Sequence, residues 1–231
     1  MEHLRIGAIV FPKVDQFDFT GPFEVLSRIP DSTIHVIGKS RAPVPDVRGL
    51  ILTPDITFAE CPSLDVLVIP GGAGQQDLME DEITLSFIRL QARNARYIFS
   101  VCTGALLCGA AGLLQDVRAT THWSAFHLLP YFGAIPVNAR VVVDDRHISA
   151  AGVSAGLDGA LRLASLVRDE RLAREIQLSI EYSPEPPFNS GSPETAAKEI
   201  VEAVRHSYES IGESRLATAE RIAAKLGVKL P

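Results

Sequence analysis

The residue in this sequence with the clearest capacity for chemistry is Cys102, in the segment YIFSVCTGALLCG at 97–109. A run of β-branched and aromatic residues there gives way to small residues, so the pattern predicts a strand, the cysteine and a helix in immediate succession. The free N–H groups of a helix N-terminus lower the pKa of a nearby thiol, ordinarily about 8.5. We therefore predict that Cys102 is a nucleophile. The alternative is a small buried hydrophobe, which is our interpretation of Cys61 and Cys108.

A glycine-rich loop, PGGAG at 70–74, follows the apolar run LDVLVIP. It matches neither the GxGxxG pattern nor the Walker pattern of phosphate-binding loops. The simpler interpretation is a tight turn. The functional interpretation is an oxyanion-type site, in which backbone N–H groups of Gly72 and Thr103 stabilise negative charge that develops beside Cys102.

Asp18 lies between two phenylalanines in the segment FPKVDQFDFTGP at 11–22. A carboxylate among aromatic side chains is costly unless it is paired or protonated. One interpretation is that Asp18 caps the helix that follows. The other is that it donates and accepts protons beside a thiolate, with a pKa raised by desolvation and negative charge. Asp15, in the same segment, is expected to lie in a solvated turn.

His122, in RATTHW at 118–123, is a candidate partner for Cys102 in a Cys–His pair. The sequence alone does not place it next to the thiol. The other five histidines have no metal-ligand spacing with one another or with the cysteines, so we expect neither a metal nor another cofactor. They are His3, His35, His127, His147 and His206.

These candidate residues must be positioned by strands and helices that alternate along the chain. Strands are predicted at 4–11, 33–38, 50–52, 64–70 and 97–101, with a hairpin or two short strands at 141–149. Helices are predicted at 20–28, opened by Thr20, at 81–94, 104–114, 154–167 and 169–180, with a short helical stretch at 123–129. The helix at 81–94 is expected to carry the apolar residues Ile83, Leu85, Ile88 and Leu90 on one side.

Alternation of this kind predicts an α/β fold, a mostly parallel sheet with helices on both faces. We expect one α/β domain at 1–192 and a helical extension at 193–231, joined by a Pro/Ser-rich linker. In parallel sheets, functional sites form at the carboxyl ends of the strands. Asp18, the PGGAG loop and Cys102 each follow a predicted strand, so we expect them to meet there.

Composition narrows the class of protein. The 231 residues are 46% hydrophobic, enough for a sizeable core, and the net charge of -6 comes without a basic stripe, which argues against a nucleic-acid partner. We find no signal peptide and no apolar stretch long enough to cross a bilayer, and expect no membrane association. Three cysteines without paired spacing indicate a reduced, cytoplasmic protein.

Together these motifs resemble the DJ-1/PfpI superfamily, whose fold is flavodoxin-like and class I glutamine amidotransferase-like. Within it, SVCTG, RATTHW and the segment EYSPEPPFNSGSP at 181–193 are similar to the isocyanide hydratases. The resemblance implies hydration of an isocyanide to an N-substituted formamide through a thioimidate on Cys102. It further implies that Asp18 is the acid/base, that the amides of Gly72 and Thr103 steady the charge, and that the chain is a homodimer without a cofactor.

Two departures from the superfamily patterns bear on the alternatives. Thr103 stands where peptidase-like members carry a histidine, which makes a peptidase the least favoured function. Asp18 stands where DJ-1-like members carry a glutamate, which counts against a cysteine-based oxidation sensor or a glyoxalase. A non-catalytic ligand-binding module is a third alternative, because related transcription regulators share CTG and ATTHW. Those regulators continue into a DNA-binding helical domain, whereas the tail here has room for only one or two helices.

Overall fold

The apolar runs become the central strands of a seven-stranded sheet. The computed structural model describes residues 2–229. The strand order is β10-β11-β7-β6-β1-β2-β5, with every neighbouring pair parallel except β10 and β11. Helices cover both faces, so the inner strands show continuous apolar runs rather than alternation. The strands are β1 (Leu4–Ile9), β2 (Ser32–Gly38), β5 (Ile56–Thr57), β6 (Val66–Ile69), β7 (Tyr97–Val101), β10 (Val141–Asp144) and β11 (His147–Ala150).

Two small sheets lie outside the central one. An antiparallel pair joins β3 (Val44–Pro45) to β4 (Ile51–Leu52), and a parallel pair joins β8 (Arg118–Ala119) to β9 (Ile135–Pro136). Of these four strands, only β4 falls in a predicted strand. Segments of two residues are too short to show a side-chain period.

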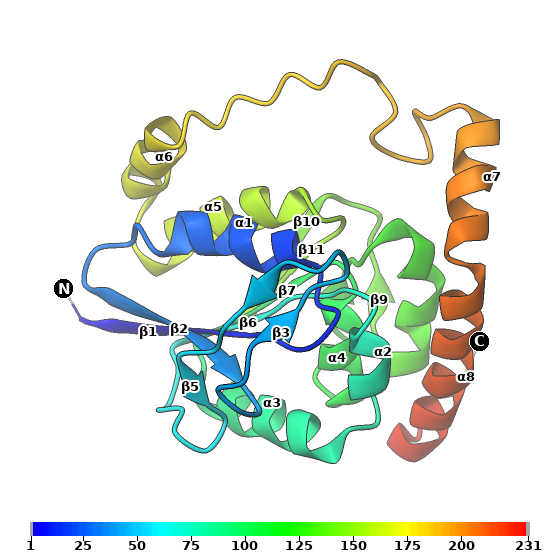
Figure 1. Cartoon of the computed structure of the whole chain (residues 1–231), viewed down its shortest axis with the longest axis horizontal. Helices are drawn as coiled ribbons and strands as arrows, with labels where there is room; N and C mark the ends of the chain where they lie inside the picture. Colours follow the sequence, from blue (N-terminus) through cyan, green and yellow to red (C-terminus); the bar gives the residue numbers. More distant parts are fainter. Residues whose placement is uncertain (1, 230–231) are drawn as a thin grey trace.

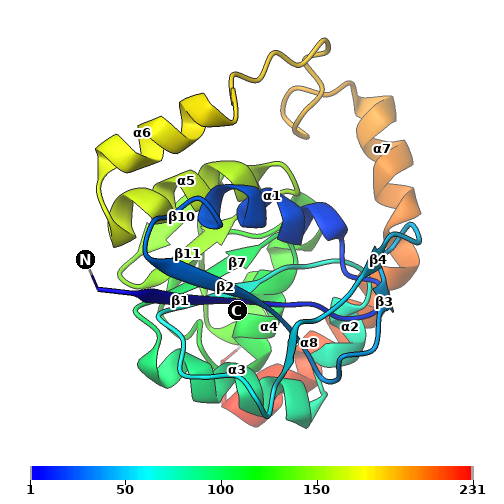
Figure 2. The same ribbon diagram turned by 60° about the vertical axis from the view of Figure 1, so that its left-hand side comes forward.

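The helices form a layer on each face of the sheet (Figures 1 and 2). Helices α1 and α5 pack together on one face, and α6 packs on α5. Helices α2, α3, α4 and η1 lie on the other face, where α8 packs against η1. The helices are α1 (Gln16–Leu26), α2 (Gln75–Leu78), α3 (Glu82–Asn94), α4 (Gly104–Ala110), the 3-10 helix η1 (Trp123–Phe132), α5 (Ala155–Val167), α6 (Glu170–Ser179), α7 (Lys198–Ser207) and α8 (Glu209–Leu226).

Two details of the predicted helices are wrong. Helix α1 begins at Gln16 rather than Thr20, and its N-cap is Asp15, whose side chain accepts a hydrogen bond from the N–H of Phe17 at 3.1 Å. Asp15 is therefore the cap, a role we had considered for Asp18. In α3, Ile83 and Leu90 are exposed, so the predicted apolar residues do not share one side. They lie seven residues apart on one side of the helix, whereas the core side carries Leu85, Phe87, Ile88 and Ala92.

Helices α7 and α8 follow the linker, and α8 shares the core of the α/β domain. Ala219 and Ile222 of α8 belong to the same buried cluster as Leu129 and Phe132 of η1. In Figure 1 the linker arches from α6 to α7, and α7 and α8 form a column along the side of the molecule opposite the N-terminus. None of the helices within residues 2–229 combines the length and apolar character needed to span a bilayer.

Candidate active site

Cys102 occupies a sharp turn between β7 and α4. Its φ is 55°, which is a left-handed conformation. Any residue other than glycine adopts this conformation only at a cost in free energy, so neighbouring contacts must hold Cys102 there. Its N–H donates to the carbonyl of Ala150 at 2.9 Å, and its own carbonyl accepts from the Thr121 hydroxyl at 2.7 Å. Thr121 of the RATTHW segment is thus the residue that binds the turn. The thiol side chain lines a cavity although only 7% of the residue is exposed.

Asp18 lies in the first turn of α1 and is completely buried. Its Oδ2 accepts a hydrogen bond from the N–H of Gly71 at 3.0 Å, and the Cys102 side chain faces the carboxyl group. Burial, followed by the charge of Asp15, raises the pKa of Asp18 to about 8. The Cys102 side chain and the hydrogen bond from Gly71 oppose this rise without cancelling it. At neutral pH Asp18 is therefore a protonated acid beside a thiol.

The pKa of Cys102 moves in the direction opposite to our prediction. Burial, and next the charge of Asp18, raise it well above its ordinary value, whereas the N–H of Thr103 lowers it. The helix N-terminus contributes less than desolvation because the sulfur is shielded from water. When Asp18 holds its proton, the second cause of the rise disappears. The two groups therefore titrate as one coupled pair.

The PGGAG loop positions the acid. Gly71 donates to Asp18, while the N–H of Gly72 donates to the hydroxyl of Thr103 at 3.2 Å. The role of Gly72 as an oxyanion donor stays a prediction, and in this structure its N–H binds Thr103. Of the two predicted donors, Thr103 has the N–H that lowers the pKa of the Cys102 thiol.

Close packing of this loop makes Gly72 intolerant of a side chain. Its φ is 121°, and a Cβ there would lie 2.2 Å from the backbone nitrogen of Asp15. We expect Gly72→Ala to lower the free energy of unfolding by at least about 2 kcal/mol, measured by urea denaturation. The matched control is Gly212→Ala in α8, where a Cβ meets nothing within 4 Å and a modest gain is expected. Equal urea midpoints for Gly72→Ala and the wild type would refute the close packing.

His122 lines the same cavity, but it is not positioned as a base for Cys102. Within residues 2–229, no hydrogen bond joins the two side chains, and Nδ1 of His122 instead lies 2.8 Å from the hydroxyl oxygen of Ser124. Burial, followed by the charge of Arg215, lowers the pKa of His122 to about 4. His122 is therefore neutral at physiological pH, and its ring lies edge-on to Tyr208 with the ring centroids 5.5 Å apart.

The cavity beside Cys102 has a volume of about 460 Å³ and combines segments from the whole chain. Its floor holds Cys102 and Thr103, and its walls carry both polar and apolar side chains. They include Asp15, Asp46, Val47, Arg48, His122, Val153, Tyr208, Ile211 and Arg215.

The sequence profile of the DJ-1/PfpI family matches residues 4–166. The chain belongs to the DJ-1/PfpI family. An isonitrile hydratase of Pseudomonas putida is 50% identical over 226 residues, covering 98% of this chain and 99% of the relative. A crystal structure of a ThiJ/PfpI family protein from Pseudomonas syringae has a TM-score of 0.92 and 40% identity, covering 95% of this chain and 91% of that chain. The glutathione-independent glyoxalase DJR-1.2 of Caenorhabditis elegans is 26% identical over 128 residues, 54% of this chain and 68% of the relative.

The DJ-1/PfpI match ends before the C-terminal helices, yet these helices close one side of the cavity. Tyr208, Ile211 and Arg215 all lie beyond residue 166 and all line it. Sequence reasoning missed them because no local motif marks them. One signal was present: Arg215 lies on the same face of α8 as the buried residues Ala219 and Ile222, so a charged residue interrupts an apolar stripe.

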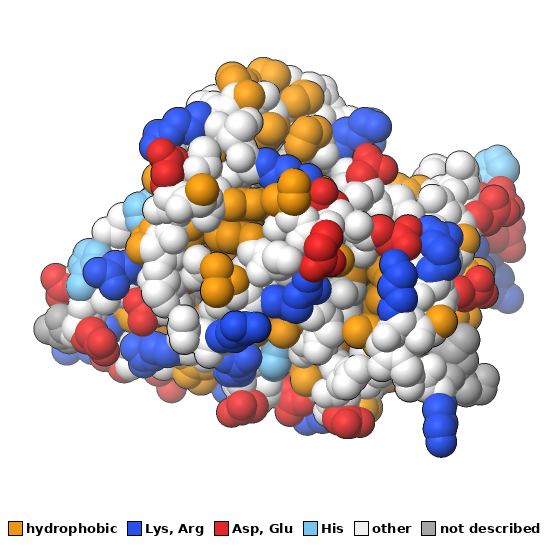
Figure 3. All heavy atoms as spheres, turned by 90° about the horizontal axis from the view of Figure 1, so that it is seen from below, with side chains coloured by type: hydrophobic (Ala, Val, Ile, Leu, Met, Phe, Trp, Pro, Cys, Tyr) orange, Lys and Arg blue, Asp and Glu red, His pale blue; other side chains and the backbone are white. Residues whose placement is uncertain are grey.

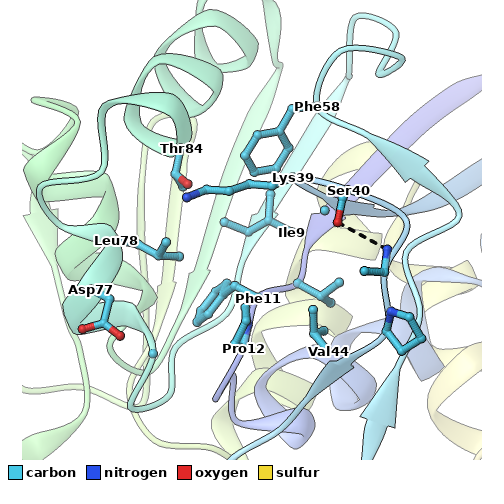
Figure 4. A pocket seen from close by; sticks show the side chains of 15 residues that line it. Ile9, Phe11, Pro12, Lys39, Ser40, Val44, Phe58, Asp77, Leu78 and Thr84 are labelled. Atoms are coloured by element: carbon cyan, nitrogen blue, oxygen red, sulfur yellow. Dashed lines mark hydrogen bonds between the residues drawn. The ribbon is translucent and has the colours of Figure 1, made fainter.

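A second cavity, of about 400 Å³, lies elsewhere in this DJ-1/PfpI chain (Figure 4). Its walls include Ile9, Phe11, Val44, Phe58 and Leu78. Cys102 lines the first cavity and not this one, so we assign the chemistry to the first cavity. Among residues 2–229, no three or more His, Cys, Asp or Glu side chains are grouped to hold a metal ion.

Proposed function

We propose that this chain adds water to isocyanides (isonitriles) to give N-substituted formamides. The observation that carries the proposal is the buried Asp18 carboxyl group beside Cys102, whose side chain lines the cavity, in a chain similar to the isonitrile hydratase of Pseudomonas putida along almost its whole length. An isocyanide carbon must gain both a proton and a nucleophile. A protonated acid facing a thiol supplies both at the same place.

The first step forms a covalent intermediate. Because both pKa values are raised, the resting pair is a protonated Asp18 beside a Cys102 thiol. The reactive form arises when the thiol proton leaves to solvent, so that Asp18 keeps its proton and Cys102 is a thiolate. The Asp18 proton passes to the isocyanide carbon as the sulfur forms a bond to that carbon, giving the thioimidate R–N=CH–S–Cys102. Asp18 is left ionised. The N–H of Thr103 stabilises the thiolate before attack.

The second step uses the ionised Asp18 as a base. It takes a proton from water as the water oxygen bonds to the thioimidate carbon, and that proton passes on to the substrate nitrogen. The tetrahedral intermediate R–NH–CH(OH)–S–Cys102 collapses by breaking the C–S bond. The hydroxyl proton returns to Asp18, the electron pair returns to sulfur as thiolate, and R–NH–CHO leaves.

Cysteine chemistry, surface charge and exposed apolar residues support a compartment, a class of partner and an oligomeric state for the enzyme. Free thiols at Cys61, Cys102 and Cys108 suit the reducing cytoplasm. The net charge of -6, together with the intermixed acidic and basic side chains on the face in Figure 3, argues against a nucleic-acid partner. The family resemblance supports a homodimer. The exposed Leu178 of α6 and Phe188 of the linker are apolar groups that a second copy can cover. The segment 193–231 is an extension of the α/β domain at 1–192.

The competing function is a glyoxalase, supported by the similarity to DJR-1.2 and by a cysteine turn that both reactions can use. One assay separates the two. Purified protein is mixed with cyclohexyl isocyanide or with methylglyoxal, and N-cyclohexylformamide or lactate is measured by NMR. We expect catalytic formation of the formamide and no lactate above the rate without protein. Lactate without formamide would replace the hydratase by the glyoxalase.

A further inference from the structure

Arg215 of α8 is a buried cation that lines the same cavity as the Cys102 thiol. Only 5% of the residue is exposed. Its Nε donates to the side-chain oxygen of Gln75 at 3.0 Å, and its Nη2 donates to the carbonyl of Gly72 at 3.1 Å. Both acceptors are neutral. Arg215 takes part in none of the ion pairs found within residues 2–229.

Burying a guanidinium without a counter-ion costs desolvation free energy. The groups able to compensate the charge of Arg215 are the anions that line the same cavity. Two carboxylates line the cavity, but neither forms an ion pair with Arg215 within residues 2–229: Asp15 accepts from the N–H of Phe17, and Asp46 accepts from the N–H groups of Arg48 and Leu50. Arg48 is a second cation there, and the remaining titratable groups around the thiol are uncharged at neutral pH. They are Asp18, His122 and Tyr208, whose pKa values lie respectively at about 8, at about 4 and above the ordinary tyrosine value.

The anion that best compensates Arg215 is therefore the sulfur itself. The charge of Arg215 lowers the pKa of Cys102, and the charge of Cys102 in turn raises the pKa of Arg215. The cation thus favours the thiolate that attack on the substrate requires.

Arg215 also supports the loop that places the acid. It binds the carbonyl of Gly72, whose N–H binds Thr103, and the preceding Gly71 binds Asp18. The Arg215 guanidinium therefore holds the loop that binds both Asp18 and Thr103.

We propose that Arg215 is a positioning residue of the active site: its buried charge compensates the Cys102 thiolate, and its bond to Gly72 fixes the loop that holds Asp18 and Thr103. The effect on kcat rests on the proposed hydratase function, whereas the effect on the thiolate does not. Helix α8, which lies outside the DJ-1/PfpI match, then contributes a functional residue to the active site.

The test measures the alkylation rate of Cys102 by iodoacetamide between pH 5 and 10, with the adduct located by mass spectrometry. The variants are Arg215→Met and Arg215→Lys. The control is Arg221→Met, on the same helix, which removes an exposed ion pair with Glu80. We expect Arg215→Met to move the midpoint upward by about one pH unit, with Arg215→Lys near the wild type because it keeps the charge.

The same proteins are assayed for formamide formation. Arg215→Met is expected to lower kcat at least about tenfold with little change in KM, while Arg221→Met matches the wild type. If Arg215→Met does not fold, Arg215→Gln replaces it, because its amide can still donate to a carbonyl. An unmoved alkylation midpoint in the neutral variant overturns the proposal, and so does an equal shift in Arg215→Lys.

The two proposals fail separately. If the wild type forms no formamide but its alkylation midpoint depends on the charge at position 215, the hydratase function is refuted and the role of Arg215 in the thiolate stands. If the wild type forms formamide and neither the midpoint nor kcat responds to Arg215→Met, the hydratase stands and Arg215 has only a structural role.

Discussion

An Asp18→Asn protein is expected to hydrate cyclohexyl isocyanide at least about a thousand-fold more slowly than the wild type. The amide keeps the shape of the side chain and can still accept the hydrogen bond from Gly71, but it can neither protonate the substrate carbon nor take a proton from water. The measurement is kcat for formamide formation. The control is Glu24→Gln, which makes the same chemical change at an exposed position of the same helix, where the carboxylate pairs with Arg28.

The same substitution is expected to stabilise the fold. The pKa of Asp18 is about 8 in the folded protein against 3.8 for an ordinary aspartate, so between these pH values the folded state binds the proton more tightly. Because the unfolded chain then holds fewer protons, wild-type stability falls as pH rises from about 4 to about 8. Asp18→Asn removes that loss, a gain on the order of a few kcal/mol at pH 8.

Urea denaturation at pH 5 and pH 8 tests the sign of this effect. The difference in unfolding free energy between Asp18→Asn and the wild type should be larger at pH 8 than at pH 5. Glu24→Gln should show no such growth with pH. A difference that stays constant or shrinks would mean that Asp18 is ionised in the fold, and its role as the resting acid would have to be abandoned.

The central sheet was predictable because burial on both faces leaves a strong mark on sequence. β1, β6 and β7 are continuous apolar runs that end in a turn, and each was found. The start of α1 was misplaced because Thr20 and Pro22 imitate a helix opening. The structure instead uses Asp15 as the cap and accommodates Pro22 inside the helix. Tertiary packing of α1 on α5 overrides the local signal.

The proximity of Cys102, Asp18 and Thr103 was predictable for a different reason. Each follows a parallel strand, or belongs to the turn that does, and the carboxyl ends of such strands meet. The pKa of Cys102 was not predictable, because its sign is decided by how completely the fold removes water from the sulfur. Arg215 lies more than one hundred residues away in sequence, and its bond to Gly72 exists only after α8 docks on η1.

A Cys102→Ala protein is expected to lose formamide formation by at least about ten-thousand-fold. Without the sulfur, no thioimidate can form, and water must attack the free isocyanide directly. The measurement is formamide produced in long single-batch reactions, with acid-quenched wild-type protein examined by mass spectrometry for the thioimidate adduct on Cys102. The control is Cys61→Ala, which removes a half-buried thiol whose pKa is raised to about 11 by burial and then by the charge of Asp55.

The Cys102→Ala result decides between catalysis and binding. A binding module needs the cavity but not the thiol, so it would hold isocyanide equally well in both proteins and convert it in neither. A hydratase that uses covalent catalysis converts it in the wild type and in Cys61→Ala alone. Turnover that survives in Cys102→Ala but vanishes in Asp18→Asn would assign the reaction to acid–base catalysis by Asp18 acting on water.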